Sequence, residues 1–90
     1  MRLIKLSKET DKFLKTLPPK QFRQVVLESF KLAKDVEQAD VKKLQGHSEF
    51  YRKDLGEYRI IFRYDDEILY LTLIGKRNDG EVYRKLERKT

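Results

Sequence analysis

The apolar residues of this chain change their spacing once, and that change limits the folds open to it. From residue 20 to residue 37 they recur at helical spacing, as Phe22, Val25, Val26, Ala33 and Val36. Between Tyr58 and Tyr64, apolar and aromatic residues instead occupy every second position, which is the period of a strand. A helix and a strand that are each apolar on one side must cover that side with another element, so we predict helices packed on one face of a sheet.

The first third of the sequence predicts a strand followed by a helical hairpin. Leu3–Leu6 is typical of a short strand, and Ser7 is placed to cap the N-terminus of a first helix. Pro18 and Pro19 end that helix. Pro19 also suits the first turn of a second helix, because the N–H that proline lacks would have no partner there.

The second half of the sequence predicts strands and a final helix. Asp65–Glu67 has turn chemistry and leads into Ile68–Ile74, a nearly continuous apolar run that indicates a central strand. Gly75 closes this strand. Asn78–Gly80 is a further turn, in which Asp79 can cap a last helix.

Together the elements predict one domain, residues 1–90, with an α+β fold of order β-α-α-β-β-β-α. We expect an antiparallel-rich twisted sheet with the helical hairpin on one face and a short C-terminal helix. The other face of the sheet is expected to stay open. A chain of 90 residues is near the size at which one core suffices without disulfides or metal ions.

The open face is predicted to be basic. Because side chains alternate along a strand, Arg52 and Asp54 share a face of one strand. Arg59, Ile61 and Arg63 share a face of the next strand. If both sets point away from the helices, they form a polar, concave surface.

Two further residues are predicted to reach this surface, Arg77 from the end of the central strand and Tyr83 from the last helix. Arginine suits phosphate, because its planar fork donates two parallel hydrogen bonds and keeps its charge. Cleavage of RNA by its own 2′-hydroxyl also needs a base and an acid, but no metal ion. Nearby cations would favour the phenolate of Tyr83, which could act as the base, stack on a nucleobase, or simply cover the sheet edge.

The composition favours an acidic partner. The chain has 21 Lys and Arg against 15 Asp and Glu, a net charge of +6, which fits nucleic acid, an acidic membrane surface or an acidic protein segment. It has no Cys and a single His, His47, which is expected to be a loop residue. No residues have the spacing of a metal site, so we expect neither metal nor cofactor. The short, charged N-terminus and the absence of a long apolar run favour a cytoplasmic protein that makes no membrane contact.

Four motifs follow one another along the chain: Lys43-Leu44-Gln45-Gly46, Tyr51-Arg52, Gly56-Glu57-Tyr58-Arg59-Ile60-Ile61-Phe62, and Gly75-Lys76-Arg77 with Glu81-Val82-Tyr83. In this order and spacing they resemble the RelE/ParE superfamily of bacterial and archaeal toxins, over the whole chain. The resemblance implies a toxin of a type II toxin–antitoxin system, with a cognate antitoxin as partner. RelE-type members are mRNA endonucleases that cleave codons in the ribosomal A site and so inhibit translation, whereas the ParE branch poisons DNA gyrase.

Within the RelE branch, the resemblance implies roles for four residues. Arg52 stands where a basic residue is proposed to help activate the attacking 2′-hydroxyl. Arg59 and Arg77 match arginines that hold the scissile phosphate, and Tyr83 matches a late tyrosine near the cleaved bond. These four residues are the predicted catalytic set of a metal-independent endoribonuclease that acts on mRNA at the ribosome.

Asp54 departs from the family pattern, since relatives often have Lys or Arg at this place. A carboxylate there repels phosphate and could pair with Arg59 or Arg63. Four other cations are predicted RNA contacts, with plain surface charge as the alternative: Lys42, Lys43, Arg63 and Lys76.

Two other functions stay open, a ParE-like gyrase poison and a catalytically degenerate, RNA-binding toxin. Arg77 and Tyr83 together favour the endonuclease, because gyrase-directed relatives generally lack the late tyrosine. The carboxylate of Asp54 keeps both alternatives in play.

Overall fold

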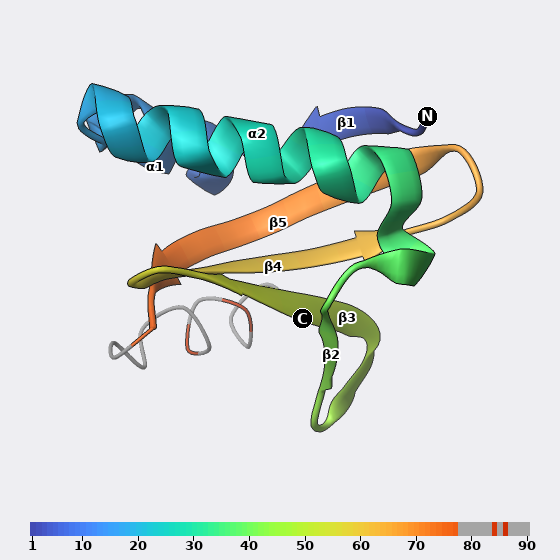
Figure 1. Ribbon diagram of the computed structural model, residues 1–90. Coiled ribbons are helices and arrows are strands. Elements are labelled where there is room, and N and C mark those ends of the chain that lie inside the picture. Colours follow the sequence, from blue (N-terminus) through green and yellow to red (C-terminus); the bar gives the residue numbers. More distant parts are fainter. Residues whose placement is uncertain (78–83, 85, 87–90) are drawn as a thin grey trace.

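The computed structural model describes residues 1–77, 84 and 86. The elements in these residues are, in order (Figure 1), β1 (Leu3–Leu6), α1 (Lys8–Thr16), α2 (Pro19–Asp35), the 3₁₀ helix η1 (Val36–Gln38), β2 (Lys42–Leu44), β3 (His47–Leu55), β4 (Tyr58–Tyr64) and β5 (Ile68–Lys76). The predicted α+β class is confirmed, and β2 is a short strand that the sequence did not indicate. The predicted turn at 78–80 lies outside the described residues, as does all of the predicted last helix except Arg84 and Leu86, which are helical.

One five-stranded sheet runs in the order β1-β5-β4-β3-β2. β1 pairs with β5 in parallel, and the other pairs are antiparallel. The helical hairpin separates β1 from the rest of the sheet in sequence, which allows the first strand to lie beside the last. β5 lies inside the sheet between β1 and β4, so the central strand predicted for Ile68–Ile74 is confirmed.

The helical hairpin forms as predicted and lies on one side of the sheet (Figure 1). Ser7 caps α1, because its Oγ accepts a hydrogen bond from the backbone N–H of Thr10 at 3.1 Å. Pro19 occupies the first turn of α2. The helix ends at Asp35, slightly before the predicted boundary, and η1 continues the chain. None of the helices in the described part of the chain is both long and apolar enough to cross a membrane.

The main core lies between the helices and the sheet. Its buried side chains come from α1, α2, η1, β4 and β5: Leu14, Val25, Leu32, Ala33, Val36, Ile60, Phe62, Leu69, Leu71 and Ile74. In β4, the buried Ile60 and Phe62 alternate with Arg59 and Arg63. The predicted apolar side of this strand therefore faces the helices, and its arginines face away from them.

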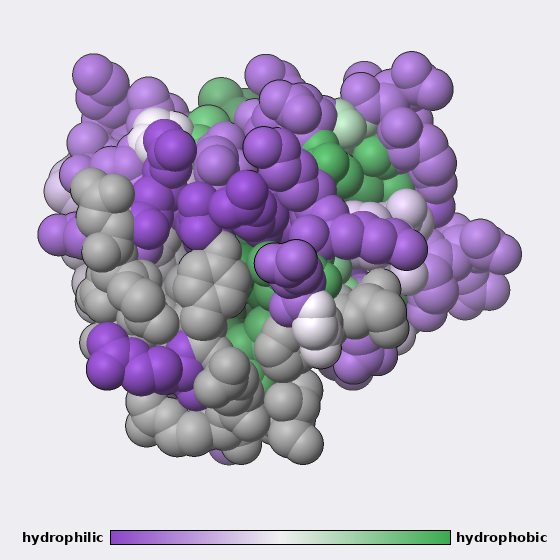
Figure 2. Space-filling view, turned by 90° about the horizontal axis from the view of Figure 1, so that it is seen from below, coloured by the Kyte–Doolittle hydropathy of each residue, from purple (hydrophilic) through white to green (hydrophobic). Residues whose placement is uncertain are grey.

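The sequence predicted that the opposite face of the sheet stays open, but part of this face is buried. It carries a second cluster of buried side chains: Leu44, Phe50, Ile61, Leu73 and Leu86. A β-bulge contributes to this cluster, because Phe62 pairs with Leu71 but Ile61 pairs with Leu73, so that Thr72 is an extra residue of β5. The bulge brings Leu73 to the same face as Ile61. Figure 2 shows the molecule from this side, with limited hydrophobic areas among hydrophilic side chains.

Candidate active site

Strand pairing brings predicted site residues together at one end of the exposed sheet face. The turn Gly56–Glu57 joins β3 to β4 and sets Asp54 directly opposite Arg59. Arg52 precedes Asp54 by two residues and shares its face. On the β5 side, the residue directly opposite Arg59 is Gly75, which has no side chain.

Asp54 joins two of the predicted arginines. Its Oδ1 accepts a hydrogen bond from Arg59 Nε at 2.8 Å, and its Oδ2 lies 3.8 Å from Arg77 Nη2. The side chain of Arg59 is 13% exposed and that of Arg77 is 47% exposed, so the group is shielded on one side and open to solvent on the other. We call Asp54, Arg59 and Arg77 the Asp54 cluster. A carboxylate held between two guanidiniums occupies the position that a phosphate bound by both arginines would take.

The surrounding cations keep Asp54 ionised. The hydrogen bond from Arg59 holds the pKa of the Asp54 carboxyl below its ordinary value, and the charges of Arg59, Arg52 and Arg77 act in the same direction, while burial opposes them. Asp54 is therefore a carboxylate at neutral pH. A phosphate that enters the cluster must displace this carboxylate or share the arginines with it.

The turn between β3 and β4 holds Arg77 in place. The backbone N–H of Arg77 donates to the carbonyl of Glu57 at 2.8 Å, and its Nη1 donates to the carbonyl of Gly56 at 3.3 Å. Gly56 has a φ of 58°, in the left-handed region that favours glycine. The same turn thus aligns Asp54 with Arg59 and anchors Arg77, which is distant in sequence.

Arg52 lies in a shallow cavity beside the cluster. The cavity has a volume of about 120 Å³ and is lined by Asp40, Lys42, Arg52, Lys53 and Asp54. Lys53 is engaged, because its Nζ donates to the carbonyl of Asp40 at 3.2 Å. Lys42 lies opposite Arg52 and shares its face. Lys42 and Arg52 therefore extend positive charge from the cluster toward the edge strand β2.

Two predicted RNA contacts lie on the other side of the sheet. Lys43 is opposite Tyr51, which packs against the main core, and its Nζ is 5.9 Å from the centroid of the Tyr51 ring. Lys76 is opposite Tyr58, whose ring meets a phenylalanine of α1. Because directly opposite residues point to the same face, this placement separates Lys43 and Lys76 from the predicted site.

Arg63 shares the exposed face of the sheet but lies outside the Asp54 cluster. It follows Arg59 by four residues along β4, and its guanidinium carbon is 3.8 Å from the centroid of the Tyr70 ring. Of the two partners that the sequence offered to Asp54, the structure selects Arg59. The sequence contained the signal for this choice, because a two-residue turn at Gly56–Glu57 pairs the residues that lie equally far from it.

Tyr83 lies outside the described residues, and its catalytic role stays a prediction. His47, which was expected in a loop, is instead the first residue of β3. Among residues 1–77, 84 and 86, no three His, Cys, Asp or Glu side chains are grouped as ligands for a metal ion.

The geometry suits a phosphodiester. Arg59 and Arg77 already hold one anionic group from two sides, and Arg52 lies close enough for its charge to act on that group. Guanidinium groups keep their charge at any physiological pH, so they can stabilise the charge that builds on phosphate oxygens during RNA cleavage.

Known proteins resemble this chain in sequence and in fold, although no protein-family model matches it. A Methanocaldococcus jannaschii protein named "Putative toxin RelE1" is 32% identical over 81 residues, which cover 82% of this chain and 88% of that protein. In the RelE–RelB complex of Pyrococcus horikoshii, the similar chain is 27% identical, with a TM-score of 0.70 over 86% of this chain and 96% of that one. A mutant of the Escherichia coli toxin RelE in the free state has the same fold, with a TM-score of 0.81, 17% identity, and coverage of 98% and 96%. The chain therefore belongs to the RelE toxin family.

Proposed function

We propose that this protein is the toxin of a toxin–antitoxin system and cleaves mRNA codons in the ribosomal A site, which inhibits translation in the cytoplasm. One observation carries the proposal: Arg59 of β4 and Arg77, which directly follows β5, converge on a single anionic group beside Arg52. Membership of the RelE family supports it. A site built in this way binds a phosphodiester through arginines alone and requires no metal ion.

In the proposed reaction, the scissile phosphate replaces the Asp54 carboxylate between Arg59 and Arg77. The 2′-oxygen attacks the adjacent phosphorus, the bond from phosphorus to the 5′-oxygen breaks, and the 5′-oxygen takes a proton from water, which leaves a 2′,3′-cyclic phosphate and a 5′-hydroxyl. The two arginines stabilise the charge on the non-bridging oxygens. The charge of Arg52 eases loss of the 2′-hydroxyl proton, and Tyr83 is proposed to accept that proton.

The site is expected to work slowly on free RNA. The cations that interact with Asp54 are arginines, which do not exchange protons near neutral pH, so they provide little general acid–base catalysis. A ribosome that holds the mRNA in a reactive conformation would supply the missing rate enhancement through positioning. The proposed substrate is therefore mRNA on the ribosome rather than RNA in solution.

The proposed partner is a cognate antitoxin. The relative from Pyrococcus horikoshii was solved in complex with RelB. This chain carries a net charge of +6, which favours an acidic antitoxin segment that neutralises the arginines. The complex should accordingly weaken as the salt concentration rises.

A non-catalytic, RNA-binding toxin is the second candidate, and Asp54 favours it specifically. Its carboxylate occupies both Arg59 and Arg77 and repels phosphate. In that case the exposed face would bind RNA without cleaving it.

The proposal is tested with a defined mRNA on stalled ribosomes in a reconstituted translation system, with RNA ends mapped by primer extension. Wild-type protein should cleave at A-site codons, and Arg77→Ala should abolish the cleavage. Tyr83→Phe tests the proposed base directly. Lys76→Ala is the matched control, because it removes a neighbouring cation on the other side of the sheet.

Two results would contradict the proposed endonuclease activity. If wild-type protein binds ribosomes but leaves every codon intact, the degenerate toxin replaces it as the leading function. If instead the protein inhibits DNA supercoiling by purified gyrase, it acts as a gyrase poison.

A further inference from the structure

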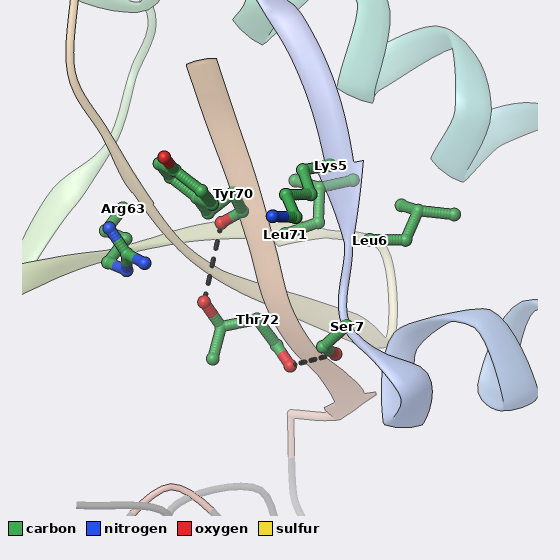
Figure 3. Close-up of a pocket in the computed structure, with 7 residues that line it drawn as sticks. All are labelled: Lys5, Leu6, Ser7, Arg63, Tyr70, Leu71 and Thr72. Carbon is green, nitrogen blue, oxygen red and sulfur yellow. Dashed lines mark hydrogen bonds between the residues drawn. The ribbon is translucent and has the colours of Figure 1, made fainter.

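A second group of hydrogen-bond donors lies on the exposed side of the sheet, apart from the Asp54 cluster. Lys5 of β1, Tyr70 of β5 and Arg63 of β4 are consecutive partners across three neighbouring strands. Together with Ser7 and Thr72 they line a cavity of about 230 Å³ (Figure 3), which we call the Tyr70 pocket. The remaining wall comes from two leucines of β1 and β5.

Tyr70 lies between two cations (Figure 3). The guanidinium carbon of Arg63 is 3.8 Å from the centroid of the Tyr70 ring, a distance that allows a strong cation–π interaction. Stacking on the ring fixes Arg63 but leaves its N–H groups available, because these lie in the guanidinium plane. On the other side, Lys5 provides an ammonium group, and both cations are solvent-exposed.

Thr72 adds a hydroxyl donor to the pocket. It is the extra residue of the β5 bulge, and its Oγ1 donates to the carbonyl of Tyr70 at 3.4 Å, which is a long and weak hydrogen bond. Ser7, in contrast, is committed, because its Oγ donates to the carbonyl of Thr72 at 2.6 Å and accepts from the N–H of Thr10. The donors available to a ligand are therefore Lys5, Arg63 and Thr72.

The acidic group whose charge acts on Arg63 is Asp65, and backbone N–H groups are its main partners. Asp65 Oδ1 accepts hydrogen bonds from the backbone N–H groups of Glu67 and Ile68, each at 2.8 Å. These bonds are the main reason why the pKa of Asp65 is lowered, and the charge of Arg63 and a hydrogen bond from the Tyr70 side chain contribute less. Arg63 thus keeps most of its capacity to bind an external anion.

The Tyr70 pocket and the Asp54 cluster occupy the same face of the sheet. Leu69 and Leu71 are buried under the helices, so Tyr70, between them, points to the opposite side. Arg63 and Arg59 are four residues apart on β4, which corresponds to roughly 13 Å along the strand. A nucleic-acid strand that reaches both places would cross over the buried cluster around Ile61, which lies between them on β4.

We propose that the Tyr70 pocket binds a phosphate of the RNA strand, beyond the phosphate that the Asp54 cluster holds. The inference rests on the proposed function in taking RNA as the ligand. A forked guanidinium, an ammonium and a hydroxyl around one cavity match the non-bridging oxygens of a phosphodiester. An acidic peptide would offer carboxylates to the same donors, but the shared face and the alignment along β4 favour a continuous polyanion.

The test measures binding of a fluorescent ten-nucleotide RNA with 2′-O-methyl sugars, which cannot be cleaved, by anisotropy over a series of salt concentrations. The double variant Lys5→Ala/Arg63→Gln should bind about tenfold more weakly than wild type, and the magnitude of its salt slope should fall by about 0.7, the contribution of one phosphate on a single strand. Thr72→Val, which keeps the side-chain shape, should weaken binding by about twofold to threefold.

The matched control is Arg23→Gln/Lys31→Ala, which removes the same charge from exposed positions of α2, on the other side of the sheet. Equal weakening in the control would mean that overall charge, rather than the pocket, binds the RNA, and would overturn the inference. Unchanged RNA affinity together with weaker binding of an acidic antitoxin peptide would assign the pocket to a protein ligand and would also overturn it. Because cleavage is not measured here, the inference can fail while wild-type protein still cleaves A-site codons, and the proposed function can fail while this binding persists.

Discussion

The two faces of the sheet use neighbouring residues of the same strands for opposite purposes. On the helix side, β4 contributes Ile60 and Phe62, both fully buried in the main core. On the exposed side, the same strand contributes Arg59, which is held by Asp54 of β3. Because these residues alternate, a single strand carries both the stability and the proposed chemistry. Substitutions of Ile60 or Phe62 should therefore act on stability, whereas substitutions of Arg59 should act on the proposed chemistry.

The largest expected effect is on stability. Phe62→Ala removes a fully buried ring from the main core and should lower the free energy of unfolding by about 3–5 kcal/mol, a large part of what a domain of this size has. Urea unfolding followed by circular dichroism measures this change. If Phe62→Ala proved no more destabilising than a substitution of an exposed arginine, the division between the two faces would be wrong.

The second prediction concerns a substitution that lowers activity and leaves stability nearly unchanged. Arg59→Gln should reduce cleavage of ribosome-bound mRNA by about 10²–10³-fold, because one of the groups that stabilise charge on the phosphate is lost. Its free energy of unfolding should change by about 1 kcal/mol or less, since the ion pair to Asp54 is partly exposed. Rates from primer extension and unfolding curves on the same samples check both halves. A loss of activity that merely follows a loss of folded protein would count against a direct role.

Asp54→Asn should increase the affinity of the protein for RNA. The amide no longer competes with phosphate for Arg59 and Arg77, so non-cleavable RNA should bind about three to ten times more tightly. Anisotropy at low and high salt measures the gain, and Asp40→Asn, which removes a nearby carboxylate from the cavity beside Arg52, is the control. Weaker binding by Asp54→Asn would instead mean that the carboxylate holds the arginines in their productive positions.

A smaller effect is expected on stability when the pH is lowered. The hydrogen bond from Arg59 lowers the pKa of Asp54 in the folded protein, so the pair contributes stability that is present above the unfolded pKa, near 3.8, and is lost as the pH falls through the folded pKa. Between about pH 5 and pH 3, wild-type protein should therefore lose up to about 1 kcal/mol more stability than Asp54→Asn. Urea midpoints over this range compare the two proteins. Parallel curves would show that the pair contributes nothing to folding.

The smallest expected effect is a difference in RNA affinity between variants of two adjacent lysines. Lys42 shares the face of Arg52, whereas Lys43 points to the side of Tyr51. Lys42→Ala should weaken RNA binding by about twofold, and Lys43→Ala should leave it unchanged. The two variants have identical net charge, so equal affinities in the anisotropy assay would show that position on the sheet does not matter for these cations.

Local patterns predicted much of this molecule, because periodicity and capping act over a few residues. The change from helical to alternating spacing gave the helices and β4, and Ser7 marked the start of α1. Alternation also predicted that Arg52 and Asp54 share a face. These predictions depended on no contact between distant parts of the chain.

Long-range geometry could not be predicted in the same way. The bulge at Thr72 depends on how β4 and β5 pair, and it adds Leu73 to a buried cluster around Ile61 where the sequence predicted an open basic face. The contact of Arg77 with Asp54 depends on where β5 ends relative to the turn after β3. Periodicity does not determine either relation.

The carboxylate between the two arginines has a consequence for selectivity. On the proposed function, Asp54 acts as an internal competitor that any phosphate must displace, so a small phosphate compound that binds at this point alone gains little. A long RNA held at several points, above all on a large assembly that fixes its path, loses far less from the same competition. The toxin would then ignore the abundant free nucleotides of the cell and respond only to a polymer that is already held in place.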